Sequence, residues 1–151
     1  MVNYSDGIHL EDTSAFLIWD TDVNKLAVAH SAEVEVKGDR TIYKWGIHKI
    51  LNGLALNLTS HYWNIDKKPE ERKLTNIEFW AIGDNEATKY EELIYHHLIE
   101  NFGEAIQEET FNGGDKLRKW EIGNTKITLH FFEMHSYRLC LKLEKYQKVT
   151  L

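Results

Sequence analysis

The apolar pattern is clearest in the second half of the chain, where a helical period gives way to strict alternation. Between residues 90 and 102 apolar side chains recur every three or four positions, as on one face of a helix. Thr88 and Glu91 have the spacing of a capping box, and Gly103 suits the left-handed end of a helix. We expect a helix over residues 86–102, packed through Tyr90, Leu93, Ile94, His97, Leu98 and Phe102.

Alternating segments follow this helix and predict short antiparallel strands. Residues 112–115 and the pair Gly123-Asn124 are turn sequences. They separate expected strands at about 105–111, 116–122, 127–132 and 137–144. The apolar side of the last two strands is expected to receive the helix through Ile127, Leu129, Leu139 and Leu141.

The first half of the chain shows a looser version of the same pattern. Residues 1–14 are polar and predict irregular structure. A strand at 16–19 precedes a short helix at about 22–31, for which Asp22 is a candidate N-cap. Further strands are expected at 32–36, 40–51, 54–63 and 73–82, with a type I′ turn at Asn52-Gly53 and a charged loop at 64–72.

One helix followed by four strands is therefore predicted twice. Lys44-Trp45 and Lys119-Trp120 lie 75 residues apart, about half the length of the chain. The sequence predicts an α+β fold in which an antiparallel meander sheet carries its helices on one face. We expect residues 1–151 to form a single compact domain made of two tandem repeats, at about 16–82 and 83–145.

This order resembles the tandem architecture of the β-lactamase inhibitory protein family. The resembling elements are the helix ending at Phe102-Gly103, the strand at Lys119-Trp120, the hairpin at 127–129 and the strand at 139–143. The resemblance covers most of residues 16–145 at the level of pattern. It implies a binding protein whose exposed sheet face meets a partner, and immunity proteins, which neutralise toxins, are a similar functional class.

The overall charge narrows the range of partners. The chain has 151 residues and a net charge of −6, which disfavours nucleic acid and anionic membranes and would suit a basic protein. It contains no apolar run long enough to span a membrane, and its first residues do not have the pattern of a secretory signal. The single cysteine, Cys140, excludes an intrachain disulfide, so we expect a cytoplasmic protein.

Aromatic and histidine side chains should gather on the sheet face away from the helices. If the leucines of the strands face the helices, alternation directs another set of side chains the other way. Large rigid rings dominate protein interfaces, so this set predicts a partner-binding surface. The alternative is that the rings pack against the other repeat, a loop or a homodimer mate. The residues concerned are His61, Trp63, Trp80, His130 and Phe132.

Residues that could carry chemistry do not form a catalytic pattern. Glu92, His96 and Glu100 lie along one exposed helix face, where metal ligands would not converge, and Cys140 lies in an alternating strand without an activating neighbour. We therefore expect no cofactor, no metal and a non-enzymatic protein. The alternative function is a small-molecule-binding protein or enzyme with a pocket between the long helix and the sheet, lined by Trp19, Trp45, Trp120 and Tyr137.

Overall fold

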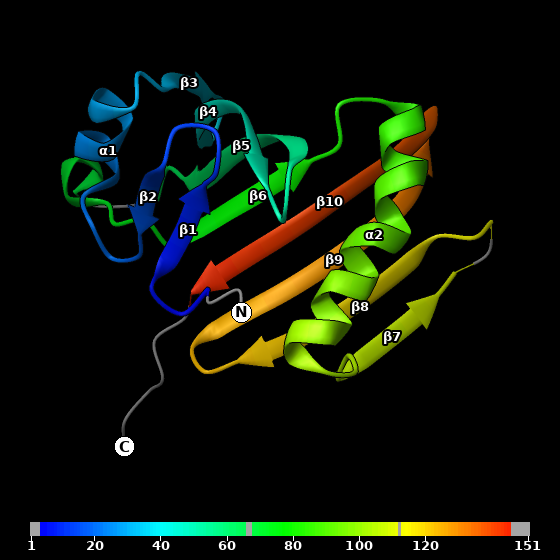
Figure 1. Cartoon of the computed structure of the whole chain (residues 1–151). Helices are drawn as coiled ribbons and strands as arrows, with labels where there is room; N and C mark the ends of the chain where they lie inside the picture. The colour runs from blue at the N-terminus through cyan, green and yellow to red at the C-terminus, as the bar shows by residue number, and fades with distance from the viewer. Residues whose placement is uncertain (1–3, 66–67, 112, 146–151) are drawn as a thin grey trace.

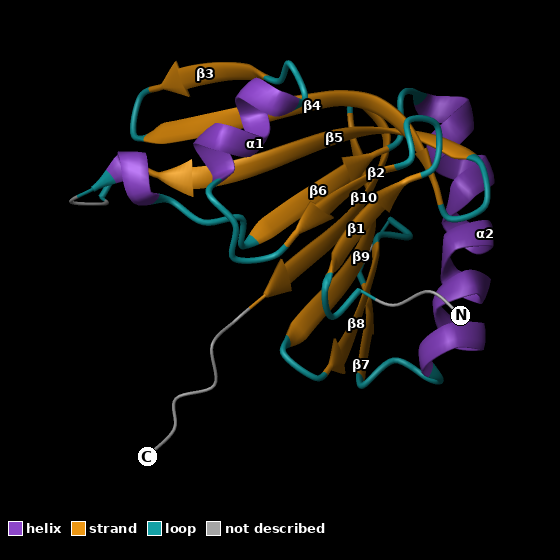
Figure 2. Ribbon diagram, turned by 60° about the vertical axis from the view of Figure 1, so that its left-hand side comes forward, coloured by secondary structure: helices purple, strands orange, loops and turns teal. Residues whose placement is uncertain are grey.

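One eight-stranded sheet spans both halves of the chain. In the computed structural model, which describes residues 4–65, 68–111 and 113–145, every neighbouring pair of strands is antiparallel. The spatial order is β3-β4-β5-β6-β10-β9-β8-β7, and the strand direction turns progressively across the sheet (Figure 2). The strands are β3 (Glu33–Lys37), β4 (Arg40–Ile50), β5 (Leu54–Trp63), β6 (Asn76–Trp80), β7 (Gln107–Thr110), β8 (Lys116–Ile122), β9 (Thr125–Met134) and β10 (Ser136–Lys145).

Both helices lie on the same face of this sheet (Figure 1). The short helix α1 (Val23–Ala29) covers the first half and the long helix α2 (Asp84–Phe102) covers the second. A hairpin of β1 (Gly7–Leu10) and β2 (Ala15–Ile18) lies between them, and a 3₁₀ turn, η1 (Pro69–Glu71), precedes β6. The predicted α+β class, with helices on one face of an antiparallel sheet, is confirmed.

The β1 strand corrects the prediction of irregular structure over residues 1–14. Ile8 and Leu10 are buried and alternate with the exposed His9, which is too short a pattern to stand out in a polar segment. The Glu11 carboxylate then accepts hydrogen bonds from the backbone N–H groups of Asn52 and Gly53, at 3.0 and 2.7 Å. The hairpin is thereby attached to the loop that joins β4 to β5.

That loop also differs from its predicted geometry. The hairpin is present, but its loop is Leu51, Asn52 and Gly53, all with positive φ, rather than a two-residue type I′ turn. Leu51 is buried. We attribute the extra loop residue to this burial and to the Glu11 carboxylate that binds the two following amides.

The long helix ends at the predicted residue but begins two residues earlier, at Asp84, and its packing face is rotated. Its buried residues are Ala87, Glu91, Ile94 and Leu98, whereas Leu93 is 49% exposed. The capping-box prediction is wrong, because the Thr88 hydroxyl donates to the Asp84 carbonyl and Glu91 points inward to Arg118, at 2.9 Å. Burying a carboxylate is costly unless it has such a partner. Because Arg118 pairs with Glu91, the helix can bury Glu91 against β8 and leave Leu93 exposed.

The two halves of the chain share one hydrophobic core between the sheet and the helices. On the strands its members are the inward positions of the alternating pattern, including Leu56, Leu58, Ile77, Phe79 and Leu141. The expected side of β9 and β10 faces α2, since Ile127, Leu129 and Leu139 are also buried. Among the residues that the structure describes, no helix lies on the opposite side of the eight-stranded sheet.

Candidate partner-binding face

The candidate site lies on the outer face, by which we mean the face of the eight-stranded sheet that α1, α2 and the β1–β2 hairpin do not cover (Figure 2). Strand register fixes which side chains it carries. Cys140 pairs with Trp80 on one side and with His130 on the other, so the three share a row across β6, β10 and β9. Asn57 on β5 and Leu117 on β8 extend this row, and none of these five residues is a carboxylate, lysine or arginine. The row ends on β7 at Glu109, opposite Leu117.

Three of the predicted residues form one aromatic cluster. The rings of Trp80 and Phe132 meet edge-on, with centroids 6.2 Å apart and planes at 79°. The His130 ring lies 4.5 Å from that of Phe132, tilted by 30°. Edge-to-face rings at this separation attract one another through their quadrupoles. We call Trp80, His130 and Phe132 the ring cluster, and all three are half-buried.

A single carboxylate connects His61 to this cluster. The Trp80 indole Nε1 donates to Glu78 Oε2 at 3.0 Å, and His61 Nε2 lies 3.4 Å from the same oxygen. The side-chain amide of Asn76 binds the backbone of His61 as both acceptor and donor, at 2.9 and 3.0 Å. These contacts hold the indole and the imidazole in fixed orientations before any partner arrives.

Trp63 lies farther along β5, at the end of the strand. It is 59% exposed, and the Arg40 guanidinium sits 4.7 Å from the centre of its ring. The predicted set is therefore placed on the outer face as expected, with His61 linked to the ring cluster through Glu78 and Trp63 at the margin. Its role in binding a partner stays a prediction.

Three partly or fully buried groups of the outer face, His61, His130 and Cys140, have pKa values shifted toward their neutral forms. Burial lowers the pKa of His61 below the usual histidine value, against the opposing effect of Glu78, and burial likewise lowers that of His130. Burial also raises the pKa of the Cys140 thiol well above its usual value. At neutral pH His130 and Cys140 are therefore uncharged, which favours contact of the row's centre with apolar groups.

Glu78, Arg40 and Cys140 belong to this surface, but sequence reasoning did not select them. Glu78 alternates with Trp80 and shares its face, which is the only signal that could have pointed to it. Its contact with His61 depends on the pairing of β5 with β6, which local alternation does not specify.

The alternative pocket between the long helix and the sheet does not have its predicted lining. Trp19, Trp45 and Trp120 are buried in the core, where their indole N–H groups donate to Tyr4 O, Ser60 Oγ and Gly103 O at 2.7, 2.9 and 3.0 Å. Tyr137 is 45% exposed. A hollow of about 420 Å³ lies elsewhere, between the β1–β2 hairpin and the β4–β5 loop.

Over residues 4–65, 68–111 and 113–145, no group of three or more His, Cys, Asp or Glu side chains could hold a metal ion. Within the same part of the chain, neither helix combines the length and the apolar composition that a membrane span requires.

Comparison with known proteins adds little to this description. No family model matches the chain, and no solved structure matches it. An uncharacterized protein of Plasmodium falciparum is 35% identical over 83 residues, which is 55% of this chain. The chain spans 4% of that protein's length, so the similarity concerns a small part of it.

Proposed function

We propose that this protein is a non-enzymatic protein-binding module whose outer face meets a partner protein. The observation that supports the proposal is the ring cluster on an uncovered sheet face, joined to His61 through Glu78. Aromatic side chains held in place in this way lose little conformational freedom on binding, and they bury a large area.

The class of partner follows from the same arrangement. A rigid sheet face with fixed rings suits an inhibitor or an immunity-type protein, which must recognise one preformed surface tightly. We propose that it acts in the cytoplasm, which accords with its single cysteine. The exposed Trp63 would extend the contact along β5 toward the edge of the sheet.

We also propose that the two halves are tandem repeats, as in the family that the sequence resembles. In chain order each half is a helix followed by four strands. In space the last strands, β6 and β10, pair at the centre of the sheet, and the first strands, β3 and β7, form its two edges. Two copies of one unit related by an approximate two-fold axis would produce this mirrored order.

Affinity capture tests the proposed binding surface. Wild-type protein and the variants Trp80→Ala and Phe132→Ala are immobilised, and proteins retained from a lysate of the source cells are identified and then titrated in pure form. The matched control is Leu93→Ala, which removes an exposed apolar side chain from the opposite side of the molecule. Circular dichroism and thermal unfolding first establish that each variant is folded.

The proposal expects each ring variant to weaken binding of the purified partner by about 30-fold or more, corresponding to 2 kcal/mol. Leu93→Ala should bind as the wild type does. Equal binding by all variants would contradict it. A captured second copy of this chain, with a doubled mass in solution, would replace the proposed partner with a homodimer mate.

A further inference from the structure

Charge is distributed unequally between the two sides of the sheet. On the outer face, register places eight basic side chains and six glutamates, although the whole chain has a net charge of −6. The basic residues are Lys37, Arg40, Lys44, Lys49, Lys119, Lys126, Arg138 and Lys142. The glutamates are Glu33, Glu35, Glu78, Glu109, Glu121 and Glu144.

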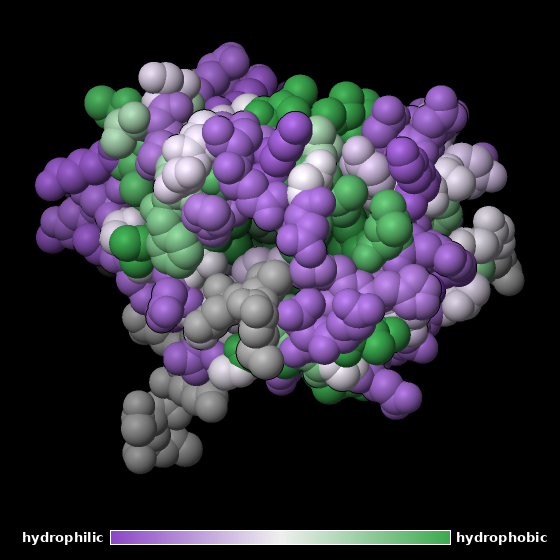
Figure 3. Space-filling model, in the orientation of Figure 1, coloured by the Kyte–Doolittle hydropathy of each residue, from purple (hydrophilic) through white to green (hydrophobic). Residues whose placement is uncertain are grey.

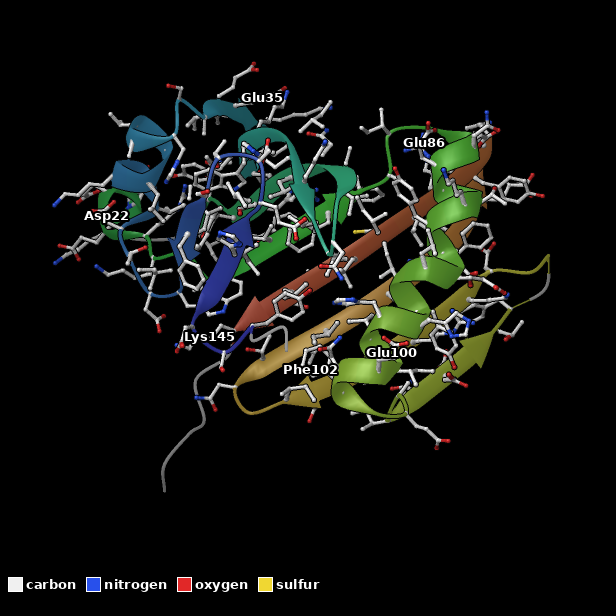
Figure 4. All side chains as sticks on the ribbon, in the orientation of Figure 1. Asp22, Glu35, Glu86, Glu100, Phe102 and Lys145 are labelled. Atoms are coloured by element: carbon white, nitrogen blue, oxygen red, sulfur yellow. The ribbon has the colours of Figure 1, made fainter. Side chains whose placement is uncertain are left out.

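The helix-bearing side has the opposite balance. Helix α2 alone contains five carboxylates and one lysine, and Glu86 and Glu100 lie near its two ends (Figure 4). The surface seen from this side is predominantly hydrophilic, with apolar residues in small separate groups (Figure 3). The net negative charge of the chain, from which we expected a basic partner, therefore lies mainly away from the ring cluster.

Three of the six outer-face glutamates are engaged by a cationic or aromatic side chain of the face, and Glu109 accepts a hydrogen bond from Gln107. Glu35 pairs with Lys44, Glu144 lies 3.6 Å from Lys142, and Glu78 is held by Trp80 and His61. The other three, Glu33, Glu109 and Glu121, lie on β3, β7 and β8, away from the centre of the sheet. The carboxylates near the ring cluster are Glu78 and Asp115, whose charge acts on His130. Each already accepts a hydrogen bond, from the Trp80 indole and from the Glu133 backbone N–H respectively.

Two basic side chains next to the ring cluster have no such partner. Arg138 lies directly opposite Phe132, and Lys119 follows Leu117, the neighbour of His130, on the same face of β8. Within the described residues neither forms an ion pair with a carboxylate. A partner that supplies carboxylates at these two positions would gain charge pairing without breaking any within the face.

We propose that the outer face recognises an acidic protein surface, with an apolar side chain over the ring cluster and carboxylates at Lys119 and Arg138. This inference rests on the proposed function and specifies its partner. A basic surface would instead meet two cations beside the rings, where Glu78, Glu144 and Asp115 already have partners within the protein. Like charges brought together in an interface disfavour binding.

A nucleic acid would also present negative charge to these residues and bases to the rings. Proteins that bind single strands without sequence preference combine stacking rings with a groove that is positive along its whole length. Here six glutamates are spread over the same face, and Glu78 accepts a hydrogen bond from Trp80 itself. The distribution favours a protein, and the oligonucleotide becomes one arm of the test.

Nuclear magnetic resonance titration of the isotope-labelled full chain provides that test. The probes are a short acidic peptide of alternating glutamate and phenylalanine, its lysine–phenylalanine counterpart and a short oligothymidylate. Each is titrated at low and at physiological salt, because screening weakens charge pairing between exposed groups. The acidic peptide should shift amide signals of β6, β8, β9 and β10 and bind more tightly than either other probe.

Charge reversal identifies the residues responsible. Lys119→Glu and Arg138→Glu should each weaken binding of the acidic peptide by about fivefold, or roughly 1 kcal/mol. Lys89→Glu on α2 is the matched control and should leave that affinity unchanged. The inference is overturned if the acidic peptide does not bind, if the basic peptide or the oligonucleotide binds more tightly, or if charge reversal has no effect.

The same titrations separate this inference from the proposed function. Trp80→Ala could weaken binding of both peptides equally while the charge reversals change the binding of neither. The outer face would then bind proteins without selecting acidic ones. If the acidic peptide shifts signals of α2 or the β1–β2 hairpin instead, the outer face is the wrong surface, and both proposals fail.

Discussion

The indole ring of Trp80 meets the ring of Phe132 edge-on, although the two residues belong to different halves of the chain and to strands that are not neighbours. Strand β10 lies between β6 and β9 and presents only Cys140 and Arg138 beneath and beside the two rings. A small side chain between two large ones lets the rings touch across it. The contact joins the two halves on the face that carries no helix.

Stability should separate the outer tryptophans from the core tryptophans. Trp63→Ala is expected to lower the free energy of unfolding by less than about 1 kcal/mol, because the ring is mostly exposed and contacts Arg40. Trp120→Ala should cost about 3–5 kcal/mol, because a buried ring is replaced by a cavity. Denaturant titration measures both values, and equal losses would contradict the assigned positions.

The Glu91–Arg118 pair should stabilise the contact between α2 and β8. Glu91 is buried and lies 2.9 Å from Arg118, whose guanidinium sits 3.7 Å from the centre of the Tyr95 ring. Glu91→Gln is expected to cost roughly 2 kcal/mol, because it leaves a cation without its carboxylate.

Two variants control for general effects of substitution near this pair. Lys116→Ala, which removes a more exposed lysine 3.6 Å from the same carboxylate, should cost less than about 1 kcal/mol. The double variant Glu91→Met, Arg118→Met should recover part of the stability lost in Glu91→Gln, because no buried charge is then left unpartnered. Lys116 and Glu108 also lose a partner, but both are more exposed. A full and equal loss in all three variants would show that packing alone explains the site.

Acidification should destabilise the protein through its partly buried histidines. Burial lowers the pKa of His61, His97 and His130 in the folded state. The unfolded chain then binds more protons than the folded chain below the usual histidine pKa of about 6.5. The free energy of unfolding that these neutral histidines contribute above a pH of about 6.5 is therefore lost as the pH falls through their lowered pKa values.

Unfolding midpoints measured between neutral and mildly acidic pH test this effect. The double variant His61→Gln, His130→Gln should lose less stability over that range than the wild type. A wild-type midpoint that rises on acidification would have the wrong sign. If the wild type and the double variant show the same dependence of stability on pH, groups other than His61 and His130 cause the loss of stability.

Cys140 should be unreactive in the folded protein. It is buried, and burial raises the pKa of its thiol well above the usual value, so little thiolate is present at mildly alkaline pH. Iodoacetamide should leave native Cys140 unmodified and should alkylate it rapidly in denaturant, as read by mass spectrometry. Fast labelling of the native protein would show that the row between Trp80 and His130 opens.

Individual helices and strands could be predicted from the sequence more accurately than the pairing between strands. Alternation over residues 127–132 and 137–144 correctly separated inward from outward positions, because each side chain's direction depends only on its own strand. Burial did not follow in every case, since the inward Tyr137 is exposed and the outward Cys140 is buried. The pairing of β6 with β10 joins segments about 60 residues apart, and no local pattern specifies it. The contact between Trp80 and Phe132 was therefore not predictable.

The errors have a similar origin in distant contacts. The inward turn of Glu91 depends on Arg118, 27 residues later in the chain. The β1 strand forms because Ile8 and Leu10 pack into a core made mostly by other segments of the chain. The shape of the β4–β5 loop depends on Glu11. In each case a tertiary partner decided a structure that local sequence left open.

Fluorine resonance of the tryptophans, observed as the purified partner is added, tests the outer face most directly. The chain has five tryptophans, of which Trp63 and Trp80 lie on that face and Trp19, Trp45 and Trp120 lie in the core. With 5-fluorotryptophan incorporated and each signal assigned by single substitution, the two outer resonances should shift or broaden while the three core resonances stay in place. A partner that perturbs the core signals and leaves those of Trp63 and Trp80 unchanged would contradict the account.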